Sequence, residues 1–514
     1  MILSNRSVQL LLAAVLGLVV LALPRPDGTL FEIAGDPSRS LLRATSGDFE
    51  LVPIDAEDGE RYRLRARAGI DEPSTVLRET ARRLDISDVE IGYIDGLSPT
   101  GFRFLAVLVF LVTLFVVEPI PLEITALLIG VFLIGTGVTP LRDTWAAYMH
   151  PVVIFIMCCL IFAIAAEKAK LTERLCQLIA RRAGGSVVRF TFLISLGLGI
   201  GSSVLHDAAA TAIGITTMIP LMRATGIQPH TNTARFMTLS LAFAASCGGM
   251  GSLVGGGRCM VAAAFLKEFT GIEINFHEWM VFAMPQAVVT EPAAVLVVNL
   301  VFRPDATLRL PQFSDEREPW TPSQRRTLVI LVAVFALWMT KGLHGLDYSV
   351  TGMAGVAVLV FSGVLRWRDI HENLEWGTAL FIFGGGICLG LAMNSSGAAS
   401  YFAHLFFPLV QGKGWLLLLG GVCVFGALVT NAMANVAAAA LILPVVIPLA
   451  QLECVDPRVL ALGLGTSSSF AFLLVIGCPP NAIAFSYRQF CSFDLTKVGL
   501  VARPVLLAVL LLFA

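Results

Sequence analysis

The sequence predicts an all-α polytopic membrane protein made of inverted repeats, with a small α+β domain inserted after its first helix. Of its 514 residues, 56% are hydrophobic and only 14% are charged, whereas about 25% of the residues in soluble domains are charged. Many apolar runs reach the roughly 20 residues that a helix needs to cross a bilayer. The net charge of −1 gives no reason to expect a nucleic-acid partner, and the cysteines lack the spacing of a disulfide framework or a metal site.

The N-terminal segment contains a short apolar run, residues 8–23, which follows Arg6. A run of this kind is either a cleaved signal peptide or a retained helix. Because no small-residue cleavage motif follows it, we expect a first transmembrane helix over residues 1–24, with its N-terminus in the cytoplasm.

Residues 25–100 differ from the rest of the chain, since they hold nearly half of its acidic residues together with several turn signals. The pattern predicts paired strands at residues 49–52 and 61–65, an amphipathic helix at residues 73–84 and a further strand at residues 88–94. No catalytic constellation lies here. We therefore expect a small extracytoplasmic, water-soluble domain that packs on the membrane part or covers it.

A first repeat is expected over residues 101–302, with apolar spans at residues 102–118, 121–138, 150–167, 190–222, 236–268 and 277–301. Lys and Arg are enriched at residues 168–189 and in the linker 303–327, which places both in the cytoplasm. Three spans lie between those two cytoplasmic segments, and three full crossings would leave the linker on the wrong side, so one of them must enter and return. Residues 190–222 are the best candidate, because His206-Asp207 interrupts them and polar backbone at membrane depth has to line a cavity or lie within protein.

The second repeat, residues 328–514, has apolar segments in the same order, at residues 328–343, 347–365, 377–393, 415–450, 457–488 and 496–514. Its counterpart of the basic segment, residues 394–414, carries a single lysine and no arginine. Corresponding segments, one strongly basic and one nearly uncharged, indicate opposite orientations, which is typical of inverted-repeat transporters. The map has about 11 crossings and two re-entrant hairpins, with the C-terminus outside, and it predicts a multi-pass protein of the inner (plasma) membrane.

Four polar breaks interrupt the apolar segments, and the two hairpin tips match each other. Laid over one another, His206-Asp207-Ala208 falls on Ala434-Asn435-Val436, and a hydroxyl lies four residues before each, Ser202 and Thr430. The other two breaks are residues 246–258 and 467–481, which are rich in Gly, Ser and Pro. Broken helices build midplane sites in transporters, because helix N-termini favour anions and unwound carbonyls hold cations. The breaks therefore predict a membrane transporter whose site lies between them.

Three charged or titratable side chains are candidates for that site. A buried Asp207 holds a cation or carries a proton, and His206 titrates near neutral pH; the alternative is that they pair with each other or cap a half-helix. Arg258 supplies a fixed positive charge to an anionic substrate or acts as the counter-ion of Asp207. Asn435 both donates and accepts hydrogen bonds, so it suits a substrate carboxylate or a sodium shell.

From about residue 102 onward the chain resembles the divalent anion–sodium symporter family of dicarboxylate, citrate and sulfate carriers. The resemblance rests on residues 118–126, on residues 375–386, and above all on the signature at residues 467–484, which includes Gly477-Cys478-Pro479-Pro480-Asn481-Ala482. It implies an elevator-type homodimer in lipid, with a scaffold part and a moving part, that carries a small anion with Na⁺ and possesses no cofactor.

The resemblance also implies contacts for particular residues. It places substrate contacts at His206, Asp207, Ala208, Gly256, Arg258, Asn435, Val436, Pro479 and Pro480, and coupling-cation contacts at Ser202, His206, Asp207, Gly251, Thr430, Met433, Asn435 and Ser468. The family's Ser-Asn-Thr tips have become His206-Asp207-Ala208 and Ala434-Asn435-Val436, and its first Pro-Pro-Asn has become Gly257-Arg258-Cys259. We expect the second sodium site, at Thr430, Met433 and Asn435, to persist and the first to be altered, with Na⁺ or H⁺ as the coupling ion.

Two other classes compete with an anion carrier. A cation/proton antiporter or arsenite-type permease is supported by the buried Asp207, and a non-transporting sensor would signal through residues 25–100. A membrane enzyme is not expected, because the sequence has no nucleophile–base pair and no metal-ligand cluster.

Overall fold

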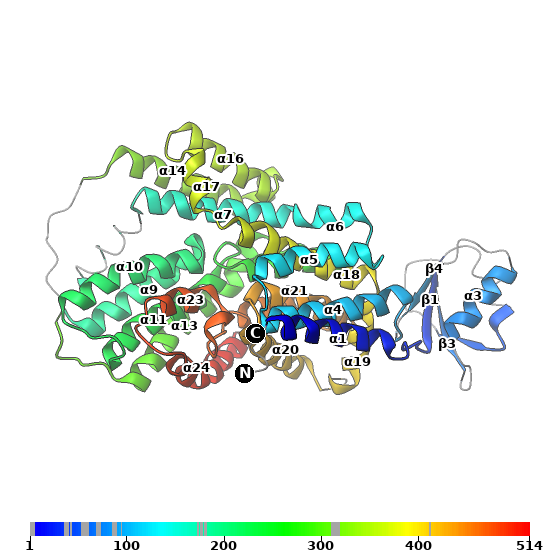
Figure 1. Ribbon diagram of the computed structural model, residues 1–514. Coiled ribbons are helices and arrows are strands. Elements are labelled where there is room, and N and C mark those ends of the chain that lie inside the picture. The colour runs from blue at the N-terminus through cyan, green and yellow to red at the C-terminus, as the bar shows by residue number, and fades with distance from the viewer. Residues whose placement is uncertain are drawn as a thin grey trace. The chain divides into compact units, whose positions relative to one another are not determined.

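The computed structural model describes residues 6–34, 41, 44–52, 61–67, 73–84, 90–93, 95–171, 174, 178, 182–183, 185–309, 319–410 and 413–513 (Figure 1). Two compact units are present. Unit 1 comprises Met1–Ala147, Cys388–Gly414 and Pro444–Val455, and unit 2 comprises Tyr148–Ile387, Trp415–Leu443 and Asp456–Ala514. Each unit therefore takes chain from both expected repeats, so the division into units does not follow the division into repeats.

The described part of residues 25–100 is a four-stranded antiparallel sheet with one helix. The strands are β1 (Leu30–Ala34), β2 (Phe49–Val52), β3 (Arg61–Ala66) and β4 (Glu90–Tyr93), in the order β2-β3-β1-β4, and the helix is α3 (Pro73–Arg83). Their core contains Phe31, Ile33, Leu64 and Leu77, none more than 2% exposed. The expected pairing of residues 49–52 with 61–65 is confirmed by the β2–β3 register.

Two details of this sheet differ from expectation. Strand β1 was missed, although it lies between β3 and β4 and joins them. The expected last strand is present as β4, but Asp88, Val89 and Ile94 lie outside the described residues.

The helices of unit 1 start with α1 (Arg6–Ala22), the expected N-terminal helix, which packs on α4 (Pro99–Val117). Gly17 permits this approach, since a Cβ there would lie 3.2 Å from the Cβ of Phe110. The unit also contains α5 (Leu122–Gly135), most of α6 (Leu141–Tyr148) and α19 (Ala398–Val410). The Ser98 hydroxyl at the start of α4 donates to the Ser396 carbonyl at 3.0 Å, which ties the first repeat to the second within unit 1.

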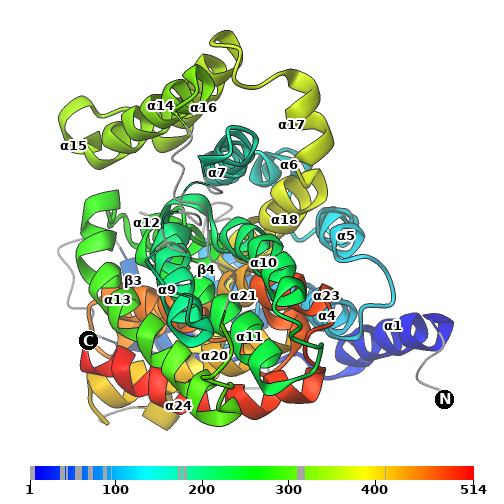
Figure 2. The same ribbon diagram turned by 90° about the vertical axis from the view of Figure 1, so that its left-hand side faces the viewer.

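In unit 2, the first repeat supplies seven elements within the described residues, and these lie at the expected places. They are α7 (Pro151–Lys168), α9 (Val187–Leu205), α10 (Asp207–Ala224), α11 (Asn232–Gly248), η2 (Gly249–Gly251), α12 (Gly257–Thr270) and α13 (Phe276–Phe302). Helices α9, α10, α11 and α13 form a tightly packed group (Figure 2). The expected interruptions at His206-Asp207 and at residues 246–258 are both confirmed as gaps between helices.

The second repeat supplies α14 (Pro322–Met339), α15 (Lys341–His344), α16 (Tyr348–Phe361), α17 (Trp367–Asn373), η3 (Gly377–Ile382), α18 (Phe383–Ser395), α20 (Trp415–Ala432), α21 (Asn435–Leu452), α22 (Pro457–Ser467), η4 (Val475–Gly477), α23 (Pro479–Ser486) and α24 (Ser492–Leu512). Helices α18 and α21 each cross the boundary between the two units. The breaks at the second tip and at residues 467–481 are again gaps between helices, so all four expected breaks exist.

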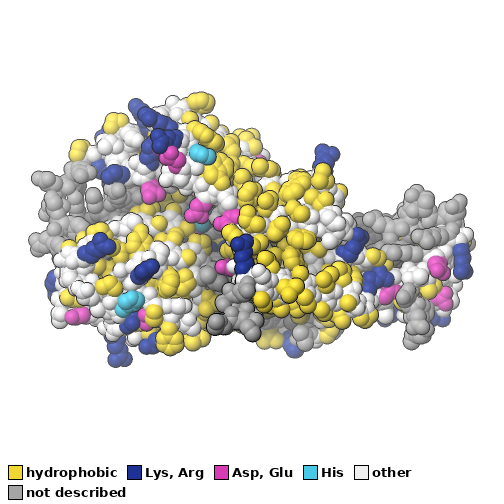
Figure 3. Space-filling view, in the orientation of Figure 1, with side chains coloured by type: hydrophobic (Ala, Val, Ile, Leu, Met, Phe, Trp, Pro, Cys, Tyr) yellow, Lys and Arg dark blue, Asp and Glu magenta, His cyan; other side chains and the backbone are white. Residues whose placement is uncertain are grey.

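Within the described residues, five helices are long and apolar enough to cross a membrane, or six if residues 379–395 and 398–406, which meet at 76°, form one broken span. Large hydrophobic side chains such as Val281, Leu300 and Val329 are exposed, and such side chains cover much of the face in Figure 3. A surface of this kind suits lipid rather than water. The full count of crossings, the re-entrant nature of the two hairpins and their sidedness stay predictions.

Candidate functional site

The first hairpin tip is a sharp break between α9 and α10. His206 joins the two helices with φ 70° and ψ 140°, a backbone conformation that non-glycine residues seldom adopt. Its Nδ1 accepts a hydrogen bond from the Ala208 N–H at 3.4 Å and so caps α10, as the alternative interpretation of this histidine allowed. Its Nε2 is buried and has no hydrogen-bond partner among the described residues.

Asp207 is the first residue of α10 and forms an ion pair with Arg258, the second residue of α12. Arg258 Nη1 lies 2.8 Å from Asp207 Oδ2, and the two side chains are 2% and 1% exposed. The Asp207 N–H also donates to the Gly255 carbonyl at 3.0 Å, so backbone and side chain both fix the tip to the third break. A buried pair of this kind is held by strong charge-assisted hydrogen bonds, and losing one partner leaves an uncompensated charge.

Arg258 reaches beyond Asp207 and connects three breaks. Its Nε donates to the Ser469 hydroxyl at 2.7 Å, and its Nη2 donates to the Ser246 carbonyl at 3.0 Å. The planar guanidinium thus donates through three different nitrogens, each to a different break, in a fixed geometry. Gly256 makes room for it, because a Cβ there would lie 2.6 Å from Arg258 Nη1. Of the two roles that the sequence allowed for Arg258, this arrangement shows the counter-ion of Asp207.

The second hairpin tip is neutral and has free hydrogen-bonding capacity. Thr430 Oγ1 lies 3.3 Å from Asn435 Oδ1 and 3.4 Å from the Ser468 carbonyl. Asn435 Nδ2 is buried without a partner among the described residues, and Met433 is buried beside it in the chain. Asn435 is the first residue of α21 as Asp207 is of α10, so the two tips superpose in the expected register.

Four helix N-termini meet at the breaks, those of α10, α12, α21 and α23. The start of α12 adjoins that of α21, since a Cβ on Gly257 would lie 3.1 Å from Val436 Cγ2. Cys478, the N-cap of α23, lies 3.5 Å from the Ser246 hydroxyl. Each N-terminus carries partial positive charge from unpaired N–H groups, of which α23 has fewer because it opens on Pro479 and Pro480, and Asp207 offsets this charge at α10 alone. The remaining three N-termini form a surrounding suited to an anion.

The other expected site residues have simpler environments. Ser202 Oγ donates to the carbonyls of Gly199 at 2.6 Å and Ala245 at 2.8 Å. A Cβ on Gly251 would lie 2.7 Å from the Ser203 hydroxyl. Ala208 is partly buried, Pro479 is exposed and Pro480 is buried, the two prolines opening α23.

Asn431 was not among the expected site residues, yet it fixes the fourth break to the second tip. Its Nδ2 donates to the Ala427 carbonyl at 2.6 Å, and its Oδ1 accepts from the Leu473 N–H at 2.7 Å. Asn431 directly follows Thr430 near the end of an apolar helix. Its place next to an expected site residue could have identified it from the sequence.

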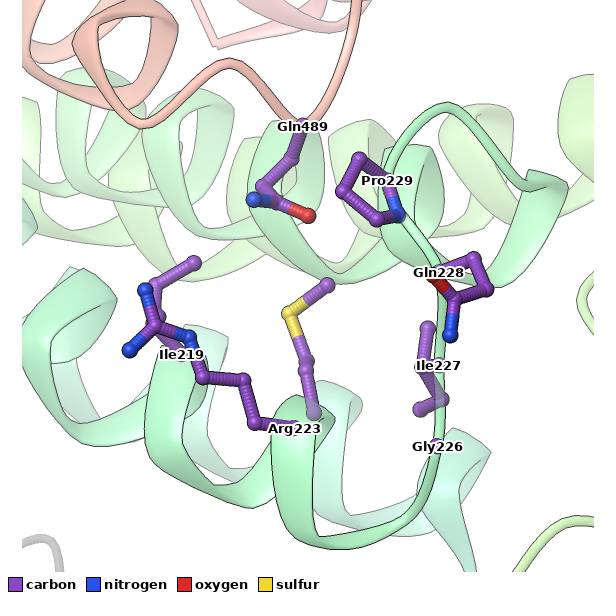
Figure 4. A pocket seen from close by; sticks show the side chains of 8 residues that line it. Ile219, Arg223, Gly226, Ile227, Gln228, Pro229 and Gln489 are labelled. Carbon is purple, nitrogen blue, oxygen red and sulfur yellow. The ribbon is translucent and has the colours of Figure 1, made fainter.

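A cavity of about 270 Å³ lies elsewhere in unit 2, at the end of α10 away from the tip (Figure 4). It is lined by Ile219, Met222, Arg223, Gly226, Ile227, Gln228, Pro229 and Gln489. None of the expected substrate or cation residues lines it. The candidate site is therefore the group of breaks and not this cavity.

Close contact between α9 and α11 positions the first tip. A Cβ on Gly248 would lie 1.9 Å from the Gly199 carbonyl oxygen, so the two helices can touch only because residue 248 has no side chain. We expect Gly248→Ala to lower the free energy of unfolding by about 1–3 kcal/mol, because backbone must move to admit the methyl group. The matched control is Gly421→Ala in α20, where nothing lies within 4 Å. Thermal unfolding of the two purified variants checks this, and equal unfolding temperatures would contradict it.

The chain resembles known membrane transporters over most of its length. Residues 91–514 match the family described as the sodium:sulfate symporter transmembrane region. An uncharacterized transporter of Haemophilus influenzae is 27% identical over 429 residues, which is 80% of this chain and 91% of the relative. The sodium-dependent dicarboxylate transporter SdcS of Staphylococcus saprophyticus is 24% identical over 451 residues, which is 81% of this chain and 86% of that protein. The solved structure of the Alcanivorax borkumensis YdaH transporter covers 98% of this chain and 97% of its own, at 14% identity and a TM-score of 0.47.

Proposed function

The chain belongs to the family of the sodium:sulfate symporter transmembrane region, the family of divalent anion–sodium symporters that its motifs indicated, and on that premise we propose that it carries a small dianion, a dicarboxylate or a sulfate-like oxyanion, together with Na⁺. It is a multi-pass membrane transporter and not an enzyme. The proposed substrate site lies among the four breaks of unit 2.

The observation that carries this proposal is the meeting of helix N-termini at the breaks. The starts of α12, α21 and α23 come from three breaks and lie around Gly257, Val436 and Cys478. Backbone N–H groups at such ends bind carboxylate, sulfate and phosphate oxygens. Val436 and Gly256 are the residues whose backbone lies at these helix starts, and we assign them to the anion.

We assign the coupling Na⁺ to the second tip. Two oxygens lie within 3.4 Å of Thr430 Oγ1, namely Asn435 Oδ1 and the Ser468 carbonyl oxygen. The Met433 carbonyl belongs to the loop that precedes α21. Neutral oxygens of this kind are the ligands that hard cations prefer. No charged side chain joins this cluster in the described residues, so a cation bound there would supply its own positive charge to the neighbouring anion.

We assign a different role to the first tip, where Arg258 acts as a built-in cation. Asp207 Oδ2 is bonded to the guanidinium at 2.8 Å, so the position at which the family resemblance places a second cation already has positive charge. With Arg258 in place, the carrier would need fewer external cations in each transport cycle than a carrier with a cation site at both tips. The cation/proton antiporter rested on the buried Asp207, and the ion pair with Arg258 argues against that alternative because it already neutralises the carboxylate.

The whole group of breaks belongs to one compact unit, which suits a carrier that moves its site as a body. Residues 204–213, 246–258, 430–441 and 467–481 all fall in unit 2. We therefore propose that unit 2 is the moving part and unit 1 the scaffold of an elevator-type homodimer in the inner membrane. Residues 25–100 belong to unit 1 and would then stay with the scaffold, outside the cytoplasm.

Uptake by reconstituted vesicles tests the proposal. Labelled succinate and sulfate are offered with the Na⁺ gradient and the pH gradient varied separately, and thermal shift of the purified protein is measured with the same anions. We expect at least one dianion to raise the unfolding temperature and to accumulate when Na⁺ is high outside. Stabilisation by cations or by pH alone, with no uptake of either anion, would support the antiporter instead.

A further inference from the structure

Glu291 is a buried carboxyl group that the proposed transport site does not use. It lies in the middle of α13, in unit 2, and is 1% exposed. Helices α9 and α11 pack against α13 (Figures 1 and 2). A carboxyl group at such a depth is costly if it is ionised and unpaired, so its surroundings show in which form it is held.

Two glycines leave the space that this carboxyl occupies. A Cβ on Gly199 of α9 would lie 2.7 Å from Glu291 Oε2, and a Cβ on Gly248 of α11 would lie 2.5 Å from Glu291 Oε1. Backbone oxygens face the same two positions. A Cβ on Gly248 would lie 1.9 Å from the Gly199 carbonyl oxygen, and a Cβ on Gly199 would lie 3.1 Å from the Ala244 carbonyl oxygen. The carboxyl oxygens and the backbone carbonyl oxygens therefore converge on one small space between the three helices.

No donor or cation of the described residues meets the carboxyl there. Among the residues that the structure describes, Glu291 Oε1 is buried without a hydrogen-bond partner, and no charged side chain pairs with Glu291. Two oxygens that face each other repel unless something positive lies between them. A proton on the carboxyl provides this, because the resulting O–H donates to a carbonyl. The helix backbones themselves bound this space. The Gly199 carbonyl already accepts a hydrogen bond from the Ser202 hydroxyl, and the Gly248 carbonyl accepts one from the Ser203 hydroxyl. Because the space is small and these carbonyls are already bonded, it suits a proton better than a hydrated or six-coordinate metal ion.

The titratable groups on the elements packed against α13 do not neutralise Glu291. They are Arg189 on α9, His206 at its end, Arg235 and Cys247 on α11, Arg325 and Arg326 on α14, Arg458 on α22, Asp494, Lys497 and Arg503 on α24, and His277 and Glu278 on α13 itself. Arg235 is paired with Asp494 at 2.9 Å. Cys247 is the group close enough to feel the charge of Glu291, and a thiol supplies no positive charge.

We propose that Glu291 is a proton-binding site, protonated when α9, α11 and α13 are in contact and deprotonated when that contact opens to water. The step is the exchange of one proton between the carboxyl and solvent, and no other bond changes. Ser202 and Ser203 bond the same backbone segments only a few residues before the first tip. Opening at Glu291 therefore disturbs the tip, which makes the proton part of the carrier's cycle; this last point rests on the proposed transport function.

Infrared difference spectroscopy of the purified protein tests the site without any transport. As the pH rises, the wild-type protein should lose a carbonyl band of a protonated carboxylic acid, and that band should be absent from Glu291→Gln, whose amide keeps the shape and the donor. Glu278→Gln is the matched control, since the same change in the same helix leaves the N-terminal capping bonds possible and should leave the band in place. In wild-type protein, a ¹³C label in the glutamate carboxyl must shift the band, whereas a label in aspartate must not, so the test does not depend on the folding of a variant.

The outcomes separate this proposal from the transport function. A band that persists in Glu291→Gln, or that follows an aspartate label, overturns the assignment. A band that disappears on addition of Na⁺ at constant pH shows that Na⁺ takes this place and also overturns it. In vesicles, we expect Glu291→Gln to keep Na⁺-dependent anion uptake and to lose the proton movement that accompanies it, as followed with a pH-sensitive dye. If no anion is transported but the band behaves as expected, the transport function fails and the proton site stands.

Discussion

Replacement of Arg258 by glutamine is expected to lower the free energy of unfolding by about 3–5 kcal/mol, the usual cost of leaving one member of a buried ion pair alone. Asp207 would stay 1% exposed with its partner gone, and Ser469 and the Ser246 carbonyl would each lose a donor. Thermal or chemical unfolding of the purified Arg258→Gln variant in detergent measures the loss. Asp207→Asn should give a loss of similar size, because it leaves the guanidinium unpaired instead.

The double variant, Asp207→Asn with Arg258→Gln, is the control. Both side chains are then neutral and can still bond to each other, so its loss should be far smaller than the sum of the two single losses. Additive losses would show that the pair is not the source of the effect, and they would contradict the role of Arg258 as a built-in cation.

The same variants report on coupling. If Arg258 replaces an external cation, Arg258→Gln leaves Asp207 free to recruit one, and the Na⁺ dependence of uptake should become steeper than that of the wild-type protein. The double variant removes both charges and should return to the wild-type steepness. If the Na⁺ dependence is unchanged in all three variants, Arg258 does not replace an external cation at the first tip.

Asn435→Ala is expected to raise the Na⁺ concentration for half-maximal uptake by about 10- to 100-fold. The substitution removes one oxygen that faces Thr430 Oγ1 at 3.3 Å. A bond to a charged group is worth about 1.5–3 kcal/mol, and each 1.4 kcal/mol is a factor of ten in affinity. Uptake measured against Na⁺ concentration gives the value.

Asn394→Ala is the matched control for this substitution, because Asn394 is an exposed asparagine on a helix of the second repeat. It should leave the Na⁺ dependence unchanged. A normal Na⁺ requirement in Asn435→Ala would move the coupling ion away from the second tip. A loss of anion affinity at saturating Na⁺ would instead assign Asn435 to the substrate.

The positions of the breaks could be predicted from sequence, because glycine, proline and buried polar residues interrupt helices through local backbone chemistry. The matched tips at His206-Asp207 and Ala434-Asn435 followed from that chemistry, and the structure starts a helix at each of the two aligned positions. Strand β1 was missed because Leu30–Ala34 gains its stability from pairing on both edges, with β3 and β4, partners that come later in the chain.

The partner of Arg258 could not be predicted from sequence alone. Sequence allowed an anion or Asp207 as its partner, and only the packing of α12 against the first tip decides between them in this arrangement. Glu291 was overlooked for a similar reason. A glutamate in a long apolar run is itself a signal of function, but the sequence did not show that Gly199 and Gly248 surround it. Division into two units was likewise hidden, since each unit joins segments hundreds of residues apart.

Arg258 also bears on how the chain is made. Its bond to Asp207 spans 51 residues, whereas its bond to Ser469 spans 211. At about 5–20 residues per second, the ribosome reaches Ser469 roughly 10–40 s after Arg258. During that interval the first repeat can enter the membrane with the charges of Asp207 and Arg258 cancelled by each other. A nascent chain that lacks either partner would have to insert a bare charge, and cellular quality control would meet the defect before the second repeat exists.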